Sequence, residues 1–293
     1  MNLKNIKKDI IIGTAQLYSK YGISNTTREQ NINKGITFLS FAIKNGFTNI
    51  DTAYAYENAH KIIGHLILKE KHNPIIYSKI PKLKSYSKEV ITEIFNKTIN
   101  DLHVNKLKGL LLHNSRDWKN KTLKIFINNL LNKNIISSFG LSIYETQEIS
   151  NDTEISILQV PGNIFNQEVI LSEELNNFIQ KQGEVHIRSI FVQGLILMNT
   201  IDIPQELDDC KKPIEIFQNI AKEINIPPEI LAIACIKKLI PSSKIVLGFD
   251  RIQQLDNIKN IDKFCINDND LNEIINFGKK HKSFIWEPRH WKL

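Results

Sequence analysis

The sequence predicts an α/β fold, and within that class a (β/α)8 TIM barrel formed by residues 1–293 as a single domain. Short, nearly continuous apolar runs alternate with longer segments of helical periodicity, in about eight pairs. Such runs are typical of parallel strands buried on both faces. A length of 293 residues suits one barrel. Eight units favour a closed barrel over a doubly wound open sheet, which remains the alternative.

The expected strands are runs rich in isoleucine, valine and leucine that end at small or polar residues. Ile10-Ile11-Ile12 before Gly13 is the first of them and shows the pattern clearly. Most later runs carry one polar residue at the carboxyl end. The strands are expected at residues 10–15, 47–53, 74–80, 108–113, 137–143, 155–161, 184–190 and 244–249.

The expected helices follow these strands and show apolar residues at spacings of three and four. Ser87 suits the N-cap of the third helix. Pro213 and Pro228 suit the starts of two helices, because proline is tolerated in the first turn. Residues 191–212 lack a clear period and are expected to be irregular. The helices are expected at 31–45, 60–70, 87–102, 123–134, 172–181, 213–224, 228–239, 252–261 and 268–279, with a short turn at 146–151.

Composition excludes several classes of function. The net charge is +7 with a pI of about 9.1, but the lysines are scattered, so we expect no nucleic-acid partner; a basic surface instead attracts phosphorylated ligands. Three cysteines without a CxxC pair predict neither disulfides nor a metal site. No apolar stretch is long enough to span a membrane, and the cytoplasm is the expected compartment. The oligomeric state is not predicted.

Polar side chains mark the ends of the predicted strands. In such a barrel, the carboxyl ends of all strands meet at one mouth, where the active site lies. Asp51, Lys79 and His113 end three successive strands and are expected to be neighbours. A buried carboxylate is costly unless it is paired, and Lys79 and His113 are its candidate partners. The strand ends are Thr14, Asp51, Lys79, His113, Ser142, Gln159, Arg188 with Ser189, and Gly248.

Common motifs of other enzymes are missing from the sequence. No GxGxxG follows the first strand, and no GxxxxGK[ST] occurs, which argues against a Rossmann or P-loop site. HExxH and GxSxG are also absent, which argues against zinc-protease and α/β-hydrolase chemistry.

The residues that do occur resemble the aldo-keto reductase family over nearly the whole chain. Asp51-Thr52-Ala53 followed by Tyr56 is similar to the family's DTAxxY signature. Lys79 and His113 then follow in the family's order, as do the segments Gly140-Leu141-Ser142, Gln159 with Pro161 and Asn163, Gln193-Gly194-Leu195 and Val246 to Leu255. The resemblance implies an oxidoreductase that reduces a small-molecule aldehyde or ketone with NADPH, or with NADH.

The resemblance also assigns catalytic roles to four residues. Tyr56 would donate a proton to the nascent alkoxide, Asp51 would hold Lys79, and His113 would orient the substrate carbonyl. Lys79 is expected to lower the pKa of Tyr56 from ~10, since about three units correspond to ~4 kcal/mol. One cation at ~4 Å supplies about that much at an effective dielectric of ~20.

Cofactor-binding residues carry over from the family more loosely. Ser142 and Gln159 match positions that hold the nicotinamide carboxamide. Arg188 falls where many members stack an aromatic ring on the nicotinamide. Its guanidinium plane can also stack, or it could meet an anionic substrate. Arg251 is the candidate for the 2′-phosphate, although Asp250 beside it disfavours that charge. The complete candidate set is Gly13, Thr14, Ala15, Asp51, Ser142, Gln159, Arg188, Ser189, Gly194, Gly248, Arg251 and Gln254.

Other interpretations remain open at this stage. The segments Arg188 to Leu195 and Pro288 to Trp291 resemble bacterial members linked to sugar or surface-polysaccharide metabolism, which suggests a polar, sugar-like substrate. Trp286 and Trp291 either close the pocket or pack on the barrel exterior. The alternatives to a reductase are a non-catalytic NADP-binding sensor or partner subunit, and an aldolase-type enzyme that forms a Schiff base on Lys79.

Overall fold

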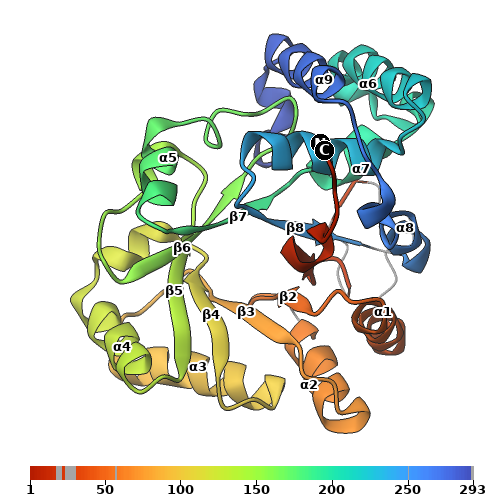
Figure 1. The fold of residues 1–293 in the computed structure, drawn as a ribbon. Coiled ribbons are helices and arrows are strands. Elements are labelled where there is room, and N and C mark those ends of the chain that lie inside the picture. The colour runs from red at the N-terminus through yellow and green to blue at the C-terminus, as the bar shows by residue number, and fades with distance from the viewer. Residues whose placement is uncertain (18–21, 24–30, 57, 250, 292–293) are drawn as a thin grey trace.

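Eight parallel strands close into a barrel surrounded by helices, as Figure 1 shows for the computed structural model. The structure describes residues 1–17, 22–23, 31–56, 58–249 and 251–291; Asp250 therefore lies outside the described residues. The strands pair in chain order, and β1 pairs with β8 as well as with β2. They are β1 Ile10–Gly13, β2 Asn49–Asp51, β3 Ile75–Ile80, β4 Leu107–Leu112, β5 Ile136–Ser142, β6 Ile155–Pro161, β7 Glu184–Arg188 and β8 Lys244–Gly248.

The helices alternate with the strands and form the outer layer (Figure 1). The hydroxyl oxygen of Ser87 accepts a hydrogen bond from the amide of Val90 at 3.3 Å, which confirms the predicted N-cap. The described helices are α1 Ile32–Lys44, α2 Ala59–Glu70, α3 Lys88–Leu102, α4 Lys121–Asn132, α5 Glu173–Gln180, α6 Lys211–Glu223, α7 Pro228–Leu239, α8 Ile252–Ile258 and α9 Asp268–Lys280.

Two details of the helix layer differ from the expectation. Helix α6 begins at Lys211, so Pro213 lies within its first turn rather than at its start, where its missing amide still breaks no helical hydrogen bond. Residues 191–210 are not fully irregular, since they contain short 3-10 turns at Val192–Leu197, Thr200–Asp202 and Gln205–Cys210.

Strand β2 is shorter than predicted, and its ending explains how the chain reaches the mouth. After Asp51 the backbone leaves β1 but keeps its hydrogen bonds to β3. The amide of Thr52 donates to the carbonyl of Tyr77 at 2.8 Å, and the amide of Tyr54 donates to the carbonyl of Lys79 at 3.1 Å. A turn closed by the amide of Tyr56 on the carbonyl of Ala53 follows. The chain therefore carries Tyr56 over the carboxyl end of β3.

The interior of the barrel is apolar in the middle and polar at the end opposite the strands' carboxyl termini. Ile11, Tyr77, Leu111 and Ile157 form the apolar cluster. Near the start of β8, Lys244 donates to the Tyr77 hydroxyl at 2.7 Å and to the Glu184 carboxylate at 2.9 Å. The same carboxylate pairs with the ring of His186 at 2.5 Å.

The network of Tyr77, Glu184, His186 and Lys244 pairs the buried charges at this end of the barrel. Burial by itself would raise the pKa of Glu184, but the hydrogen bonds and charges of His186 and Lys244 lower it to about 2. Because each charged group has a partner, the network closes the bottom of the barrel without an isolated buried charge.

The C-terminal tail packs against the segments that follow β5 and β6, with the Asn163 side chain donating to the carbonyl of Trp286 at 3.3 Å and Arg289 pairing with Glu145. Trp286 is 1% exposed and stacks on Phe165 with ring centroids 4.0 Å apart. Its indole N–H donates to the carbonyl of His281 at 2.8 Å, and that of Trp291 donates to the carbonyl of Ile285 at 2.7 Å. Trp286 is therefore a packing residue.

Two classes of feature are missing from the part of the chain described here. None of its helices is long and apolar enough to cross a membrane. Its His, Cys, Asp and Glu side chains form no group of three or more that could hold a metal ion.

Candidate active site

A buried ion pair lies at the mouth of the barrel. The Lys79 ammonium is 2.5 Å from one carboxylate oxygen of Asp51, and both side chains are almost fully buried, with 1% and 4% exposed. The second carboxylate oxygen accepts a hydrogen bond from the Gln159 amide at 2.8 Å. The carboxylate predicted to need a partner thus has one charged and one neutral donor, which compensates its burial.

The backbone beneath the pair is fixed by a neighbouring strand. The hydroxyl and the amide of Thr14 both donate to the carbonyl of Asp51 at 3.0 Å. Gly13 is the register partner of Asp51, so β1 supports β2 at this level. Thr14 therefore fixes the backbone of Asp51 and so helps to position the Asp51–Lys79 ion pair.

Tyr56 and His113 lie next to the ion pair. Their ring centroids are 5.6 Å apart in an edge-to-face arrangement. The Lys79 ammonium lies 5.3 Å from the centroid of the Tyr56 ring. The amide of His113 donates to the carbonyl of Ile80 at 3.0 Å, which holds the histidine at the end of β3. The structure thus brings together the four residues that the sequence singled out as catalytic.

The environment of these groups sets their protonation. Burial, with a smaller contribution from the charge of Lys79, lowers the pKa of His113 to about 4, so its ring is neutral at physiological pH. Burial also lowers the pKa of Lys79, against the opposing effect of Asp51. The close carboxylate nevertheless favours the charged ammonium.

The pKa of Tyr56 moves in the direction opposite to the one expected from the sequence. Burial and the charge of Asp51 raise it above its usual value. The expectation took the full charge of Lys79 as acting on Tyr56, whereas in the structure Asp51 neutralises that cation at 2.5 Å. The net field of a tight ion pair is weak, so the cost of burying a phenolate decides the direction.

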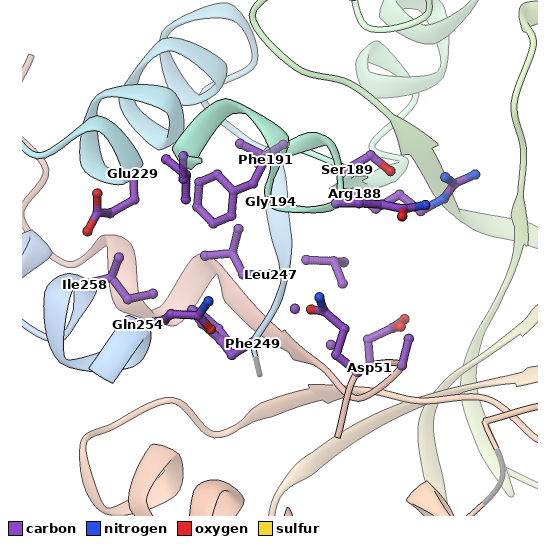
Figure 2. A pocket seen from close by; sticks show the side chains of 18 of the residues that line it. Asp51, Arg188, Ser189, Phe191, Gly194, Glu229, Leu247, Phe249, Gln254 and Ile258 are labelled. Carbon is purple, nitrogen blue, oxygen red and sulfur yellow. The ribbon is translucent and has the colours of Figure 1, made fainter. Parts of the chain in front are cut away.

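A cavity of about 330 Å³ extends from this cluster across the ends of β1, β7 and β8 (Figure 2). Asp51 and Tyr56 line one part of it, and Glu229 and Ile258 line another. Gln16, Phe191, Leu247 and Phe249 contribute to its walls. The lining residues that the sequence had named are Gly13, Ala15, Asp51, Tyr56, Gln159, Arg188, Ser189, Gly194, Gly248, Arg251 and Gln254.

Two of the candidate cofactor residues are not among the lining residues. Thr14 uses its hydroxyl on the backbone of Asp51. Ser142 is buried at the end of β5, where it is the register partner of Gln159. Gln159 is itself committed to the Asp51 carboxylate, so a carboxamide-binding role would share its side chain with the ion pair.

The loop after β7 has an unusual backbone where it borders the cavity. Ser189, Val192 and Gln193 have φ angles of 65°, 50° and 56°, and Gly194 has a φ of 93°. The left-handed region is strained for a β-branched valine. Strained backbone of this kind persists where the surrounding structure fixes it, frequently at binding sites.

Sequence reasoning missed several lining residues, of which Glu229 is the most informative. It lies in the first turn of α7 and lines the cavity near Gln254 of α8 (Figure 2). A helix that starts at the mouth of a barrel directs its first turn toward the ligand, and this could have signalled Glu229. Gln16 belongs to the segment Gly13-Thr14-Ala15-Gln16, which resembles the family's first strand but in which no site residue was named beyond Ala15, whereas Asn257 gave no signal in the sequence.

The cavity suits a dinucleotide. Glycine backbone at Gly13, Gly194 and Gly248 lines it, and a Cβ atom on Gly248 would lie 2.1 Å from the side-chain oxygen of Gln16. Phe191 and Phe249 add aromatic wall, while the α8 end is polar. Close backbone approach, aromatic surface and polar groups together match the requirements of a nucleotide cofactor.

The fold and site define a (β/α)8 barrel with a cavity, lined by glycine backbone and aromatic side chains, beside a Tyr-His-Lys-Asp cluster. The chain belongs to the aldo/keto reductase family, whose sequence profile matches residues 9–278. It is therefore an NAD(P)H-dependent oxidoreductase, and NADP(H) is the family's cofactor. Among curated proteins, none matches this sequence.

Solved structures share the fold at low sequence identity. A thermostable aldo-keto reductase in complex with epalrestat has 18% identity and a TM-score of 0.72, covering 92% of this chain and 94% of its own. An aldo-keto reductase from Bacillus halodurans in its holo form has 16% identity and a TM-score of 0.71, covering 94% and 95%. An aldo/keto reductase from Klebsiella pneumoniae, in complex with NADP and acetate, has 16% identity and a TM-score of 0.70, covering 94% and 92%.

Proposed function

We propose that this enzyme reduces an aldehyde or ketone to an alcohol, with Tyr56 as the proton donor. The nicotinamide cofactor supplies the hydride when it is bound. The observation that supports this most is the approach of a neutral imidazole and an ion-paired lysine to the phenol of Tyr56, which lines the cavity. Carbonyl reduction needs a proton for the nascent alkoxide, and these groups are suited to provide it.

The raised pKa of Tyr56 is compatible with this role. It keeps the phenol protonated at physiological pH, and an alkoxide is a stronger base than a phenolate. The Lys79 ammonium lies 5.3 Å from the centroid of the Tyr56 ring, beside the phenolate formed by the transfer. His113, held neutral, can donate one ring N–H to the carbonyl oxygen and so acts together with Tyr56 as an oxyanion site.

The proton-donor role is tested with Tyr56→Phe, which removes one hydroxyl. We expect kcat for NADPH oxidation with an aldehyde to fall by ~100-fold or more, while the Kd for NADPH changes by less than about twofold. Tyr54→Phe is the matched control, because Tyr54 is half-buried nearby and is not among the residues that line the cavity. Unchanged turnover in Tyr56→Phe would exclude this tyrosine as the donor.

The cofactor preference is assigned to NADPH, with Arg251 holding the 2′-phosphate. Arg251 borders the cavity at its α8 end, and a guanidinium recognises phosphate well. Titrations that follow nicotinamide fluorescence should show NADPH binding weakened about tenfold in Arg251→Ala and NADH binding little changed. Equal weakening of both nucleotides would place the phosphate elsewhere.

The substrate is assigned to polar, sugar-like carbonyl compounds. Around Tyr56 the cavity is lined by the polar side chains of Gln159, Arg188 and Ser189, which can hydrogen-bond to hydroxyl groups. A panel of aldoses and other hydroxylated aldehydes should show higher kcat/KM than apolar aromatic aldehydes. Activity restricted to the apolar compounds would refute this assignment.

The two alternatives predict different outcomes. A sensor would bind NADPH without turnover across the whole panel. A Schiff-base enzyme would be trapped on Lys79 by borohydride. The 2.5 Å pairing with Asp51 counts against the latter, since it favours an ammonium over the free amine that such chemistry requires.

A further inference from the structure

Arg188 is a cation at the mouth of the barrel whose charge has no role in the proposed proton transfer. It is the last residue of β7 and lines the same cavity as Asp51, Tyr56 and Gln159. Figure 2 shows its side chain directed away from Glu229 and from the α8 end of the cavity. Arg188 therefore lies at the catalytic end.

The guanidinium is held rigidly by two contacts. One terminal nitrogen donates to the carbonyl of Ile143 at 3.0 Å. Its central carbon lies 4.3 Å from the centroid of the Tyr144 ring, a stacking distance. A guanidinium carries five N–H donors, and within the described residues the bond to Ile143 is the only hydrogen bond it makes.

No carboxylate in the described part of the chain forms an ion pair with Arg188. Asp51, the acid at the mouth, is committed to Lys79 and Gln159. Burial is the main cause of the shifted pKa values of Lys79 and His113, and the charge of Arg188 contributes to lowering each. Its positive charge therefore acts on the catalytic groups without a local counterion.

Arg289 can be compared with Arg188, because both arginines contact the ring of Tyr144. Its guanidinium stacks on the Tyr144 ring as well, with its central carbon 4.7 Å from the centroid. Unlike Arg188, it pairs with Glu145 at 3.2 Å and with Glu287. The two arginines share one aromatic platform, but only Arg289 has its charge compensated by the protein.

We propose that Arg188 binds an anionic group of the substrate, a carboxylate or a phosphate, beside the carbonyl that is reduced. This rests on the proposed reductase function and narrows its substrate class. A partly buried cation without a counterion is unfavourable until a ligand supplies one. The free edge of a fixed guanidinium matches the planar carboxylate and the phosphate, to which it can donate two parallel hydrogen bonds.

The test compares aldehydes with and without an anionic group. Succinic semialdehyde is paired with its methyl ester, and glyceraldehyde 3-phosphate with glyceraldehyde. In the unsubstituted enzyme, kcat/KM should favour the anionic member of one pair by at least about tenfold, mainly through KM. A preference in the first pair identifies a carboxylate, and one in the second identifies a phosphate.

Substitutions test whether Arg188 causes the preference for anionic substrates. In Arg188→Gln the anionic-to-neutral ratio should fall to within about twofold of one, whereas Arg188→Lys retains part of it. Arg289→Gln, the matched control, should keep the ratio. A ratio near one in the unsubstituted enzyme, or a ratio that survives Arg188→Gln, would overturn the inference.

A binding measurement separates this inference from the reductase function. Butyrate and butyramide are not reduced, so calorimetric titration of the NADP⁺-saturated protein reports charge recognition alone, and phosphate is titrated in parallel. Tighter binding of butyrate or phosphate that is lost in Arg188→Gln supports the anion site even if no aldehyde is turned over. Butyrate no tighter than butyramide, together with no phosphate binding, overturns the anion site even if aldehydes are reduced.

Discussion

Replacing Lys79 by methionine tests the physical basis of the ion pair most sharply. The substitution removes the ammonium that lies 2.5 Å from the Asp51 carboxylate and leaves that carboxylate about 4% exposed. Gln159 would remain as its neutral donor, at 2.8 Å. Methionine fills a similar volume, so the main consequence is a buried carboxylate without a cation.

The expected loss of stability can be worked out from the proton balance. At pH 7 the unpaired carboxylate can become neutral by taking up a proton. From an unfolded-state pKa of ~3.9, this proton uptake costs about 4 kcal/mol. This agrees with the ~3–5 kcal/mol lost when one partner of a buried pair is removed. At pH 5 the same uptake costs only about 1.5 kcal/mol, so the penalty should shrink with acidity.

Urea unfolding, followed by circular dichroism at pH 7 and pH 5, measures this penalty. The double variant D51N/K79M removes both charges and should recover most of the stability lost in Lys79→Met. Lys97→Met is the control, since Lys97 pairs with Asp101 on the surface and should cost less than ~1 kcal/mol. If Lys79→Met and the double variant were equally destabilised, or if pH had no effect, the reasoning would be refuted.

Three further predictions follow from single sites. Glu229→Gln should strengthen NADPH binding relative to NADH, because it removes a negative charge from the cavity near α8; an unchanged ratio in fluorescence titrations would contradict this. Burial lowers the pKa of His60 to about 4, so at this residue the folded protein binds fewer protons than the unfolded chain. The free energy of unfolding should therefore fall by up to about 2 kcal/mol between pH 7 and pH 5. His60→Asn should reduce this pH dependence in urea titrations. Gly278→Ala should destabilise by ~1–3 kcal/mol, because its Cβ would lie 2.0 Å from the backbone oxygen of Ile164, and an unchanged Tm would refute that clash.

Much of the fold could be predicted because the signals are local. The range 155–161 and the helix from Pro228 to Leu239 have the bounds that the sequence predicted. Proline marks an end of each element, and apolar periodicity fills the rest. Strand β2 was predicted too long because its pairing with β1 stops at Asp51 while its hydrogen bonds to β3 continue. A single sequence does not indicate at which residue a strand stops pairing with each of its two neighbouring strands.

The site could be predicted only in part, for a similar reason. Asp51 and Lys79 were expected to be neighbours because strand ends converge in a barrel, the family resemblance implied that they pair, and they do. The direction of the pKa shift of Tyr56 depends on how closely that pair neutralises itself. Glu229 comes to the cavity through the placement of α7. The pKa direction does not follow from residue order, whereas the predicted helix start at Pro228 could have signalled Glu229.

Transfer of deuterium from the cofactor to the product shows directly whether this enzyme reduces carbonyl compounds. The enzyme is incubated with NADPH carrying deuterium at the transferable C4 position and with a carbonyl substrate from the panel, and the alcohol is analysed by mass spectrometry. Reduction by hydride transfer predicts one deuterium on the former carbonyl carbon, with the yield per enzyme sharply reduced in Tyr56→Phe. An alcohol that contains no deuterium, or no alcohol despite bound cofactor across the whole panel, would contradict the assignment of this protein as a carbonyl reductase.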